Sequence, residues 1–510
     1  MKSTQTAEPS FGKLRSMFWP IHFYELKKFI PMFLMFFFIS FNYSIMRNIK
    51  DALLINAAQN KAVIIPYIKL WGVTPAAILF IIIYSKLSNL VSKTTLFYLS
   101  IYFFVGFFSL FALFLYPYHH LLHPEQLTIA FLPPGFTEVL RLWTFSLFYI
   151  FSEIWGSVAL SLLFWQFANQ ITKISEAKRF YSLFGIGANL ALIAAGSAIG
   201  TLSGLAKCQQ LAKETSMAFK LNNLSLLFVL CCLAIMGIYW GINRYILTDA
   251  RFYDPALLKQ KNKKLKMGLL DSIKMLIKSK YLICIALLVI CYGISINLVE
   301  VTWKNYISIK YPNASDYLDF MGSYSLYLGW STIIMMLFVA GNVLRKFGWT
   351  VAALVTPVVL LILGFAFFNL IIFKESFDLW FARFGVNVLG LAVVFGTIQN
   401  ILSKACKYAL FDPTKEMAYI PLDEEAKVKG KAAIDVVGAR LGKAGGSVIQ
   451  QVLFAFGTIG FMLPYIEVIF IAVMLIWILS ATNLGRAFNK TNKQPPASPH
   501  EAKTACTSSS

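Results

Sequence analysis

The sequence has little charge. Only 14% of its 510 residues are Asp, Glu, Lys or Arg, whereas a soluble protein carries roughly 25%. Hydrophobic residues make up 58% of the chain, and the mean hydropathy is +0.66. Composition therefore excludes an ordinary soluble globular protein. It predicts an all-α integral membrane protein, embedded in a lipid bilayer, that crosses the membrane many times.

The sequence also lacks the residue patterns of metal sites and of enzymes. Its seven cysteines form no CxxC pair, and most of them lie in apolar runs, which argues against a disulfide framework or a zinc site. Three of the five histidines, His119, His120 and His123, cluster in a predicted loop with no cysteine nearby. No Ser-His-Asp arrangement stands out. We therefore expect no metal site, no cofactor and no enzymatic activity.

The formal net charge of +22 invites the hypothesis of a nucleic-acid partner. However, the Lys and Arg residues lie between apolar runs, and no nucleic-acid-binding motif accompanies them. The bias of basic residues toward cytoplasmic loops explains the excess better. Residues 1–28 are polar and basic and contain no apolar segment followed by a cleavage site, so we expect no removable signal peptide and a cytoplasmic N-terminus.

Apolar runs divide the chain into two sets of six. They fall at about 29–47, 64–84, 96–116, 141–167, 182–204 and 222–245, and then at 281–301, 320–344, 350–373, 381–402, 432–460 and 461–481. The expected organisation is a cytoplasmic segment at 1–28, a six-helix half at 29–247, a basic cytoplasmic linker at 248–280, a second six-helix half at 281–484, and a disordered cytoplasmic tail at 485–510.

The two halves resemble each other weakly. Ser40 and Asn42 in the first run recur as Ser295 and Asn297 in the seventh. Two six-helix repeats joined by a long cytoplasmic loop are the organisation of major-facilitator-like carriers, whose substrate site lies between the halves. The sequence therefore predicts twelve transmembrane helices in two major-facilitator-like halves.

Several charged residues lie in or at the edges of the apolar runs: Lys69, Glu153, Glu300 and Lys443. Such residues are costly in a membrane and mark functional sites. Glu153 has apolar residues on both sides, which favours function. Lys69 follows a proline and can alternatively reach the membrane interface through its long side chain. Glu300 can alternatively lie in the headgroups if its helix ends near Val299.

The run around Lys443 imitates a phosphate-binding loop without being one. Walker A needs four residues between its glycines and a Ser or Thr after the Lys, but Gly438 and Gly442 have three between them and Ala444 follows. A Lys on a small-residue helix suits an anionic substrate as a point charge, and a contact with a lipid headgroup is the alternative. Aromatic residues that can stack on a base are Trp71, Trp155, Trp165, Tyr292 and Trp303.

Five strings resemble one family, the nucleotide transporters or non-mitochondrial ATP/ADP translocases of obligate intracellular bacteria and plastids, and the chlamydial members most of all. They are 294–304 (ISINLVEVTWK), 164–172 (FWQFANQIT), 407–423 (KYALFDPTKEMAYIPLD), 428–437 (VKGKAAIDVV) and 441–447 (LGKAGGS). The resemblance extends from about Phe11 to Leu484. It implies exchange of ATP for ADP, with phosphate accompanying ADP in some members, by alternating access in the inner membrane of an intracellular bacterium, and a carrier that works as a monomer.

The resemblance also implies roles for individual residues. Lys69 and Lys443 match the family's Lys residues and are expected to attract phosphate, whereas Glu153 and Glu300 match its Glu residues and are expected to gate or balance charge. Asn189 matches a family Asn and is expected to donate a hydrogen bond to the ligand. Secondary candidates are Arg47, Lys50 and Lys304.

The first predicted helix departs from the family pattern. Where many ATP/ADP exchangers have Arg-Asp-Thr-Lys-Asp, this chain has the sequence RNIKD from Arg47 to Asp51. Relatives in the same family import GTP, UTP or CTP with protons, or exchange NAD for ADP. Proton-coupled or exchange import of these nucleotides is therefore the alternative function on the same scaffold.

Overall fold

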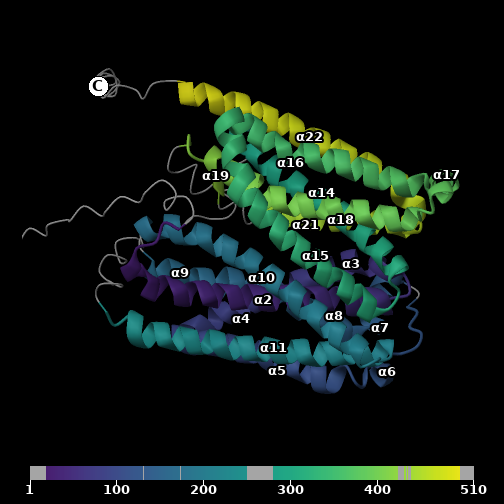
Figure 1. Cartoon of the computed structure of the whole chain (residues 1–510), viewed down its shortest axis with the longest axis horizontal. Coiled ribbons are helices and arrows are strands. Elements are labelled where there is room, and N and C mark those ends of the chain that lie inside the picture. The colour runs from purple at the N-terminus through teal and green to yellow at the C-terminus, as the bar shows by residue number, and fades with distance from the viewer. Residues whose placement is uncertain are drawn as a thin grey trace, which may run out of the picture.

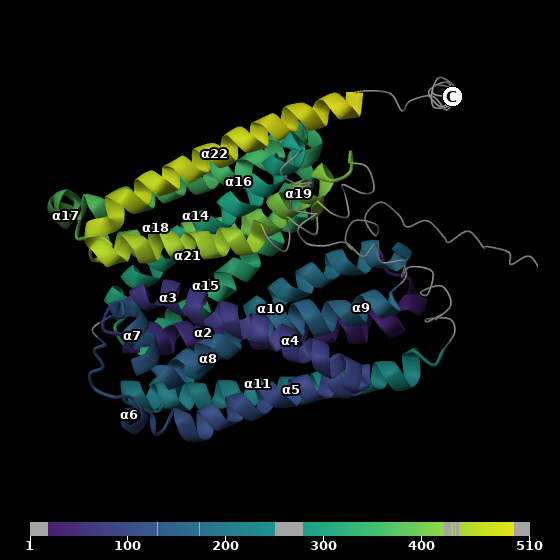
Figure 2. The ribbon, with the colours of Figure 1, turned by 180° about the vertical axis from the view of Figure 1, so that it is seen from behind.

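The computed structural model describes residues 19–129, 131–172, 174–249, 279–422, 430–431, 434 and 438–493, all of which lie in helices, turns or irregular segments. Most of residues 1–28, nearly all of the expected linker at 248–280, and the end of the expected tail lie outside the described residues. The helices form two bundles lying side by side, one from α2 to α11 and one from α14 to α22 (Figures 1 and 2).

The first bundle, called the N-half below, contains η1 (Phe23–Glu25), α2 (Leu26–Ala57), η2 (Lys61–Val63), α3 (Ile64–Tyr67), η3 (Ile68–Val73), α4 (Thr74–Leu90), α5 (Lys93–Leu110), η4 (Phe111–Leu115), α6 (His119–Leu122), α7 (Pro134–Arg141), α8 (Trp143–Trp155), η5 (Gly156–Phe164), α9 (Trp165–Ile171), α10 (Ile174–Cys208), α11 (Lys213–Gly241) and η6 (Ile242–Ile246). The second bundle, called the C-half, contains α14 (Lys280–Lys310), α15 (Ala314–Ile334), η8 (Met335–Val339), α16 (Ala340–Ile372), α17 (Lys374–Phe381), η9 (Ala382–Phe384), α18 (Val388–Cys406), η10 (Lys407–Phe411), α19 (Asp412–Ala418), α21 (Ala439–Phe456) and α22 (Ile459–Lys493).

Ten helical stretches of the described chain are long and apolar enough to cross a membrane. One of them, Ala314–Ile372, has 59 residues and is interrupted at Gly348, whose φ of 77° and ψ of 179° only glycine adopts readily. α21 is not among the ten. Large apolar side chains such as Leu79, Leu113 and Leu479 are more than half exposed on helix surfaces, as expected where lipid is the solvent. The chain is a multi-pass membrane protein.

Two expected boundaries differ from the structure. α2 already begins at Leu26, inside the expected N-terminal segment, and α22 runs to Lys493, past the expected start of the tail at 485. The apolar pattern identifies only the part of each helix that faces lipid, and both helices continue as polar turns beyond it.

The halves meet most extensively where α10 crosses α15. A Cβ on Gly196 would lie 2.5 Å from the carbonyl oxygen of Gly322, and one on Gly329 would lie 2.8 Å from that of Asn189. Only glycine allows the two backbones to approach this closely, because any side chain would overlap the facing helix. The glycines of α10 and α15 therefore form a contact surface between the halves.

Candidate functional site

The site is built on α2, which lies in the middle of the N-half and packs on α8, α10, α11 and α15. We call the end of the bundle where α2 begins, at Leu26, the proximal end, and the end where it finishes, at Ala57, the distal end. Arg47, Lys50 and Asp51 lie near one another in the distal half of α2, because they are three and four residues apart. Lys50 and Asp51 are fully buried, so both charges need partners.

Those partners come from both halves. Asp51 accepts from Lys50 at 2.9 Å and from Lys304 of α14 at 2.8 Å, which joins the N-half to the C-half. Lys50 also lies 3.1 Å from Glu153 of α8 and 3.6 Å from the centre of the Tyr149 ring. A buried carboxylate shared by two lysines satisfies charges that would otherwise be costly in the membrane.

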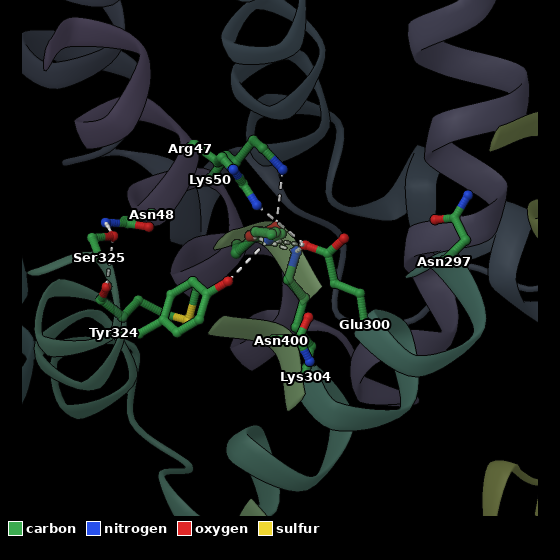
Figure 3. Close-up of polar contacts among 12 residues, drawn as sticks. Arg47, Asn48, Lys50, Asn297, Glu300, Lys304, Tyr324, Ser325 and Asn400 are labelled. Carbon is green, nitrogen blue, oxygen red and sulfur yellow. Dashed lines mark hydrogen bonds and ion pairs between the residues drawn. The ribbon is translucent and has the colours of Figure 1, made fainter. Parts of the chain in front are cut away.

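Glu300 is the second shared carboxylate (Figure 3). One of its oxygens lies 3.0 Å from Lys304, 3.4 Å from Arg47 and 3.7 Å from Lys404 of α18. α14 continues to Lys310, so Glu300 lies inside the helix and not at its end in the headgroups. Lys404 also donates to the hydroxyl of Tyr324 at 3.0 Å.

Lys69 and Lys443 approach the same centre through Asn297. The ammonium of Lys69, on the π-helical turn η3, donates to the Asn297 side-chain oxygen at 2.8 Å. The Asn297 amide donates to the backbone oxygen of Lys443 at 2.7 Å. The Lys443 side chain is exposed and lies within electrostatic range of Glu153. Asn297 therefore links both halves at the edge of the site.

We call the following nine residues the charged centre: Arg47, Lys50, Asp51, Lys69, Glu153, Glu300, Lys304, Lys404 and Lys443. Six are cationic and three are acidic, so the formal excess is three positive charges. A cluster with this excess, reached from both halves, suits a multiply charged anion. Its ammonium, guanidinium and carboxylate groups can bind an anion and exchange ion-pair partners with it.

The sequence missed two members of this centre, Asp51 and Lys404. The expected spans ended at 47 and 402, which left both residues among the headgroups. α2 and α18 instead continue to Ala57 and Cys406. The signal that could have found Asp51 is its helical spacing from Arg47, which matches the spacing of Lys304 from Glu300.

The structure places two other predicted features elsewhere. The Asn189 amide donates to the carbonyl of Gly185 at 2.8 Å and lies 3.8 Å from the Met336 sulfur, in the contact between the halves. The histidine cluster lies near the distal end, where His123 lies 2.7 Å from the Thr144 hydroxyl. Burial, with help from His119 and Arg141, lowers the pKa of His123 to about 4. The described residues contain no group of three His, Cys, Asp or Glu that could hold a metal ion.

A second set of polar contacts joins the halves toward the distal end. Asp319 of α15 accepts from Lys220 of α11 at 2.5 Å and from Ser203 of α10 at 2.6 Å. Nearby, Lys213 donates to Asp316 at 2.6 Å. We call these contacts the distal clamp. In the described part of the chain, no ion pair joins the halves on the proximal side of Arg47, so the ion pairs between the halves lie at the centre and beyond it toward the distal end.

Comparison with known proteins gives one consistent answer. The model of a family described as TLC ATP/ADP transporter matches residues 4–488. An ADP,ATP carrier protein 1 of Chlamydia muridarum is 54% identical over 492 residues, which are 95% of this chain and 93% of the relative. The chloroplastic ADP,ATP carrier protein 2 of Arabidopsis thaliana is 46% identical over 91% of this chain and 75% of its own length.

A likeness to solved structures supports the fold alone. A bacterial homologue of the iron transporter ferroportin, in an inward-facing state, aligns with a TM-score of 0.53 at 12% identity and covers 93% of this chain and 100% of its own. This agrees with the expectation of a major-facilitator-like helical carrier. With 485 residues matched by the family model and half of the residues shared with a named carrier, the chain belongs to the TLC ATP/ADP transporter family.

Proposed function

We propose that this protein exchanges ATP for ADP across a membrane by alternating access, as a secondary transporter and not an enzyme. The observation that carries the proposal is the charged centre, because both halves contribute cations and carboxylates to it. The carrier names of its relatives support the choice of nucleotides.

The geometry suggests how the nucleotide acts. Without a ligand, Glu153 and Glu300 balance Lys50, Lys304 and Arg47. Phosphate oxygens are better acceptors for these cations because a polyphosphate carries several charges on many oxygens. A bound nucleotide therefore competes with the carboxylates and loosens the ion pairs that join the halves.

The residues of the charged centre have distinct parts in this proposal. We assign phosphate binding to Lys69, Lys443, Arg47 and Lys404, and charge balance to Glu153 and Glu300. Asn189 is assigned to packing in this conformation, because its amide is already bonded within α10.

The proposal includes a topology of twelve spans in two halves, at 29–247 and 281–484. It counts Ala314–Ile372 as two spans separated at Gly348, and α21 as a further one. We assign the proximal end to the cytoplasm. The sequence predicts that the basic N-terminal segment is cytoplasmic, and α2, which follows this segment, begins at the proximal end. The protein then lies in the inner membrane of an intracellular bacterium and works as a monomer.

Transport in liposomes tests the function. Vesicles containing the purified protein and loaded with ADP should take up labelled ATP, and vesicles without internal nucleotide should not. A protonophore should leave uptake unchanged. Uptake that needs a proton gradient, or that occurs for GTP, UTP, CTP or NAD but not for ATP, would contradict ATP/ADP exchange and favour import of another nucleotide.

Single substitutions test the assignment of the phosphate-binding residues. Lys69→Gln and Lys443→Gln should weaken binding of a triphosphate more than that of a monophosphate, because each removes one charge from the phosphate environment. If both variants bind the triphosphate and the monophosphate with the same affinities as the wild type does, these lysines lie outside the site.

A further inference from the structure

The charged centre has an order along the axis of the bundle. Tyr43, Arg47 and Asp51 follow one another at four-residue intervals on α2, so they lie on one face, with Asp51 closest to the distal end. The facing helix α8 runs in the opposite direction: Glu153 meets Lys50, and Gly156 meets Tyr43. Tyr43 is therefore one turn closer to the proximal end than Arg47.

The C-half repeats this order with a second tyrosine. α18 is antiparallel to α14, since Gly390 lies near Lys310 and Gly396 lies near Trp303. Tyr408, in the π-helical turn η10, follows Lys404 by four residues and is therefore one turn closer to the proximal end. It is 41% exposed, and Lys404 and Arg47 of the other half share one oxygen of Glu300. One partly exposed tyrosine from each half thus lies one turn to the proximal side of Arg47 and of Lys404.

Both rings are held in place. A Cβ on Gly156 would lie 2.6 Å from the Tyr43 ring, so only glycine leaves space for the ring there. The ammonium of Lys407 lies 4.5 Å from the centre of the Tyr408 ring, and it is itself paired with Asp412 at 2.8 Å. A ring fixed by its neighbours loses little further freedom when a ligand stacks on it.

The aromatic residues expected from the sequence are occupied in other ways. Trp155 and Trp303 are completely buried in helix packing. Tyr292 stacks on Phe411 at 5.5 Å between ring centres, which covers one of its faces. Trp71 donates to the side chain of Gln451 at the contact between η3 and α21. Trp165 packs against Phe36 and Tyr181. Tyr149 and Tyr324 contact Lys50 and Lys404 directly, whereas Tyr43 and Tyr408 lie on the proximal side of Arg47 and Lys404.

We propose that Tyr43 and Tyr408 bind the nucleobase between the halves, so that the nucleotide lies with its polyphosphate toward the distal end and its base toward the proximal end. This inference rests on the proposed nucleotide exchange. It gives the two ends of the ligand separate partners: the cations hold the phosphates, and the tyrosine rings stack on the base.

Isothermal titration calorimetry with two ligands tests this separation. ATP has a base and inorganic tripolyphosphate has none, so the purified full-length wild type should bind both. Tyr408→Ala should weaken ATP by a factor of about 5 to 150, the range found when an aromatic partner of a base is removed. It should leave the affinity for tripolyphosphate unchanged, which also shows that the variant is folded. Tyr408→Phe keeps the ring and should bind ATP as the wild type does.

Two further variants complete the design. Lys404→Gln should weaken both ligands by the same factor, because it acts on the phosphates. Tyr102→Ala removes an exposed tyrosine from α5, on the far side of the N-half, and should change neither affinity.

Several outcomes would overturn the inference. They are an unchanged ATP affinity in Tyr408→Ala, an equal loss of both ligands in that variant, and a wild type that binds ATP but not tripolyphosphate. A wild type that does not bind ATP would instead refute the proposed function itself, and the base-binding role with it.

Discussion

Ion pairs at the proximal end of the N-half differ from the pairs of Glu300 at the centre. Near the proximal end, Arg179 holds Glu25 with two hydrogen bonds of 2.6 and 2.7 Å, and Lys28 donates to Glu176 at 2.7 Å. At the centre, one Glu300 oxygen lies 3.4 Å from Arg47 of the other half, and 3.0 and 3.7 Å from Lys304 and Lys404 of its own half. The proximal pairs lie within one half and are short, whereas Glu300 is shared among three cations from both halves.

This difference matches what alternating access requires of each set. η1, α2 and α10 belong to one half, so the proximal pairs can stay intact while the halves move. In the proposed cycle the pairs that join the halves at the centre rearrange, and a carboxylate shared among several cations can lose one contact while keeping another. The proximal pairs are therefore expected to stabilise one half, and the shared pairs to respond to its movement.

The largest effect is expected where the shared carboxylate is completely buried. Asp51→Asn removes the partner of both Lys50 and Lys304, and breaking a buried ion pair on one side costs about 3–5 kcal/mol. We expect ATP/ADP exchange per folded molecule to fall about a hundredfold, because a free-energy change of about 3 kcal/mol in one conformational state changes its population by about that factor. Exchange rates in liposomes, normalised to folded protein, measure this.

A double variant separates folding from transport. Asp51→Asn combined with Lys304→Gln also removes one of the two positive charges that Asp51 balances, and it should recover folded yield without recovering exchange. Exchange at the wild-type rate in Asp51→Asn alone would show that the halves do not depend on this contact.

Glu300→Gln should act more weakly and mainly on turnover. Lys304 keeps Asp51 and Lys404 keeps Tyr324, and Arg47, which loses its carboxylate partner, is partly exposed to solvent. We expect turnover to fall about tenfold, equivalent to about 1.4 kcal/mol, with a much smaller change in melting temperature. A variant that unfolds early but exchanges normally in its folded fraction would assign Glu300 to structure instead.

The distal clamp lies between these two kinds of pair, because it joins the halves through short contacts. Lys220→Gln should weaken the closed distal end by about 1 kcal/mol and raise the population open on that side about fivefold. Distances between spin labels at Leu121→Cys of α6 and Leu379→Cys of α17, in a cysteine-depleted background, report the change.

Lys213→Gln is the matched control for the clamp. Lys213 is 61% exposed, and exposed pairs contribute roughly 0–1 kcal/mol, so its label distances should change less than those of Lys220→Gln. A larger change in Lys213→Gln would reverse the roles of the two pairs.

The sequence predicted the helices better than the pairing among them. Apolar runs of about twenty residues can only be membrane spans, because backbone groups in lipid must be bonded within a helix. Hydropathy, however, ended two of the predicted spans at 47 and 402, where charged residues follow the apolar run. Asp51 and Lys404 were missed for this reason, since partners from other helices allow each to lie inside the bundle.

Tertiary packing also decided the position of Asn189. The resemblance to a family predicted a ligand contact from its residue type, whereas the structure places it where α10 meets η8 and bonds its amide to Gly185. Tyr408 shows the converse. Its string was recognised as typical of the family, but only the antiparallel register of α14 and α18 places it one turn to the proximal side of Lys404.

The smallest effect on transport is expected from the proximal pair, even though its geometry is the best. Glu25→Gln removes the charge that binds Arg179 and should lower the melting temperature by a few degrees, since a hydrogen bond to a charged group contributes about 1.5–3 kcal/mol. Exchange per folded molecule should stay at the wild-type rate because η1 and α10 move together. If Glu25→Gln instead slows exchange while the melting temperature is unchanged, pairs within one half also open during the cycle. A short distance between the charged groups would then not distinguish the two kinds of ion pair.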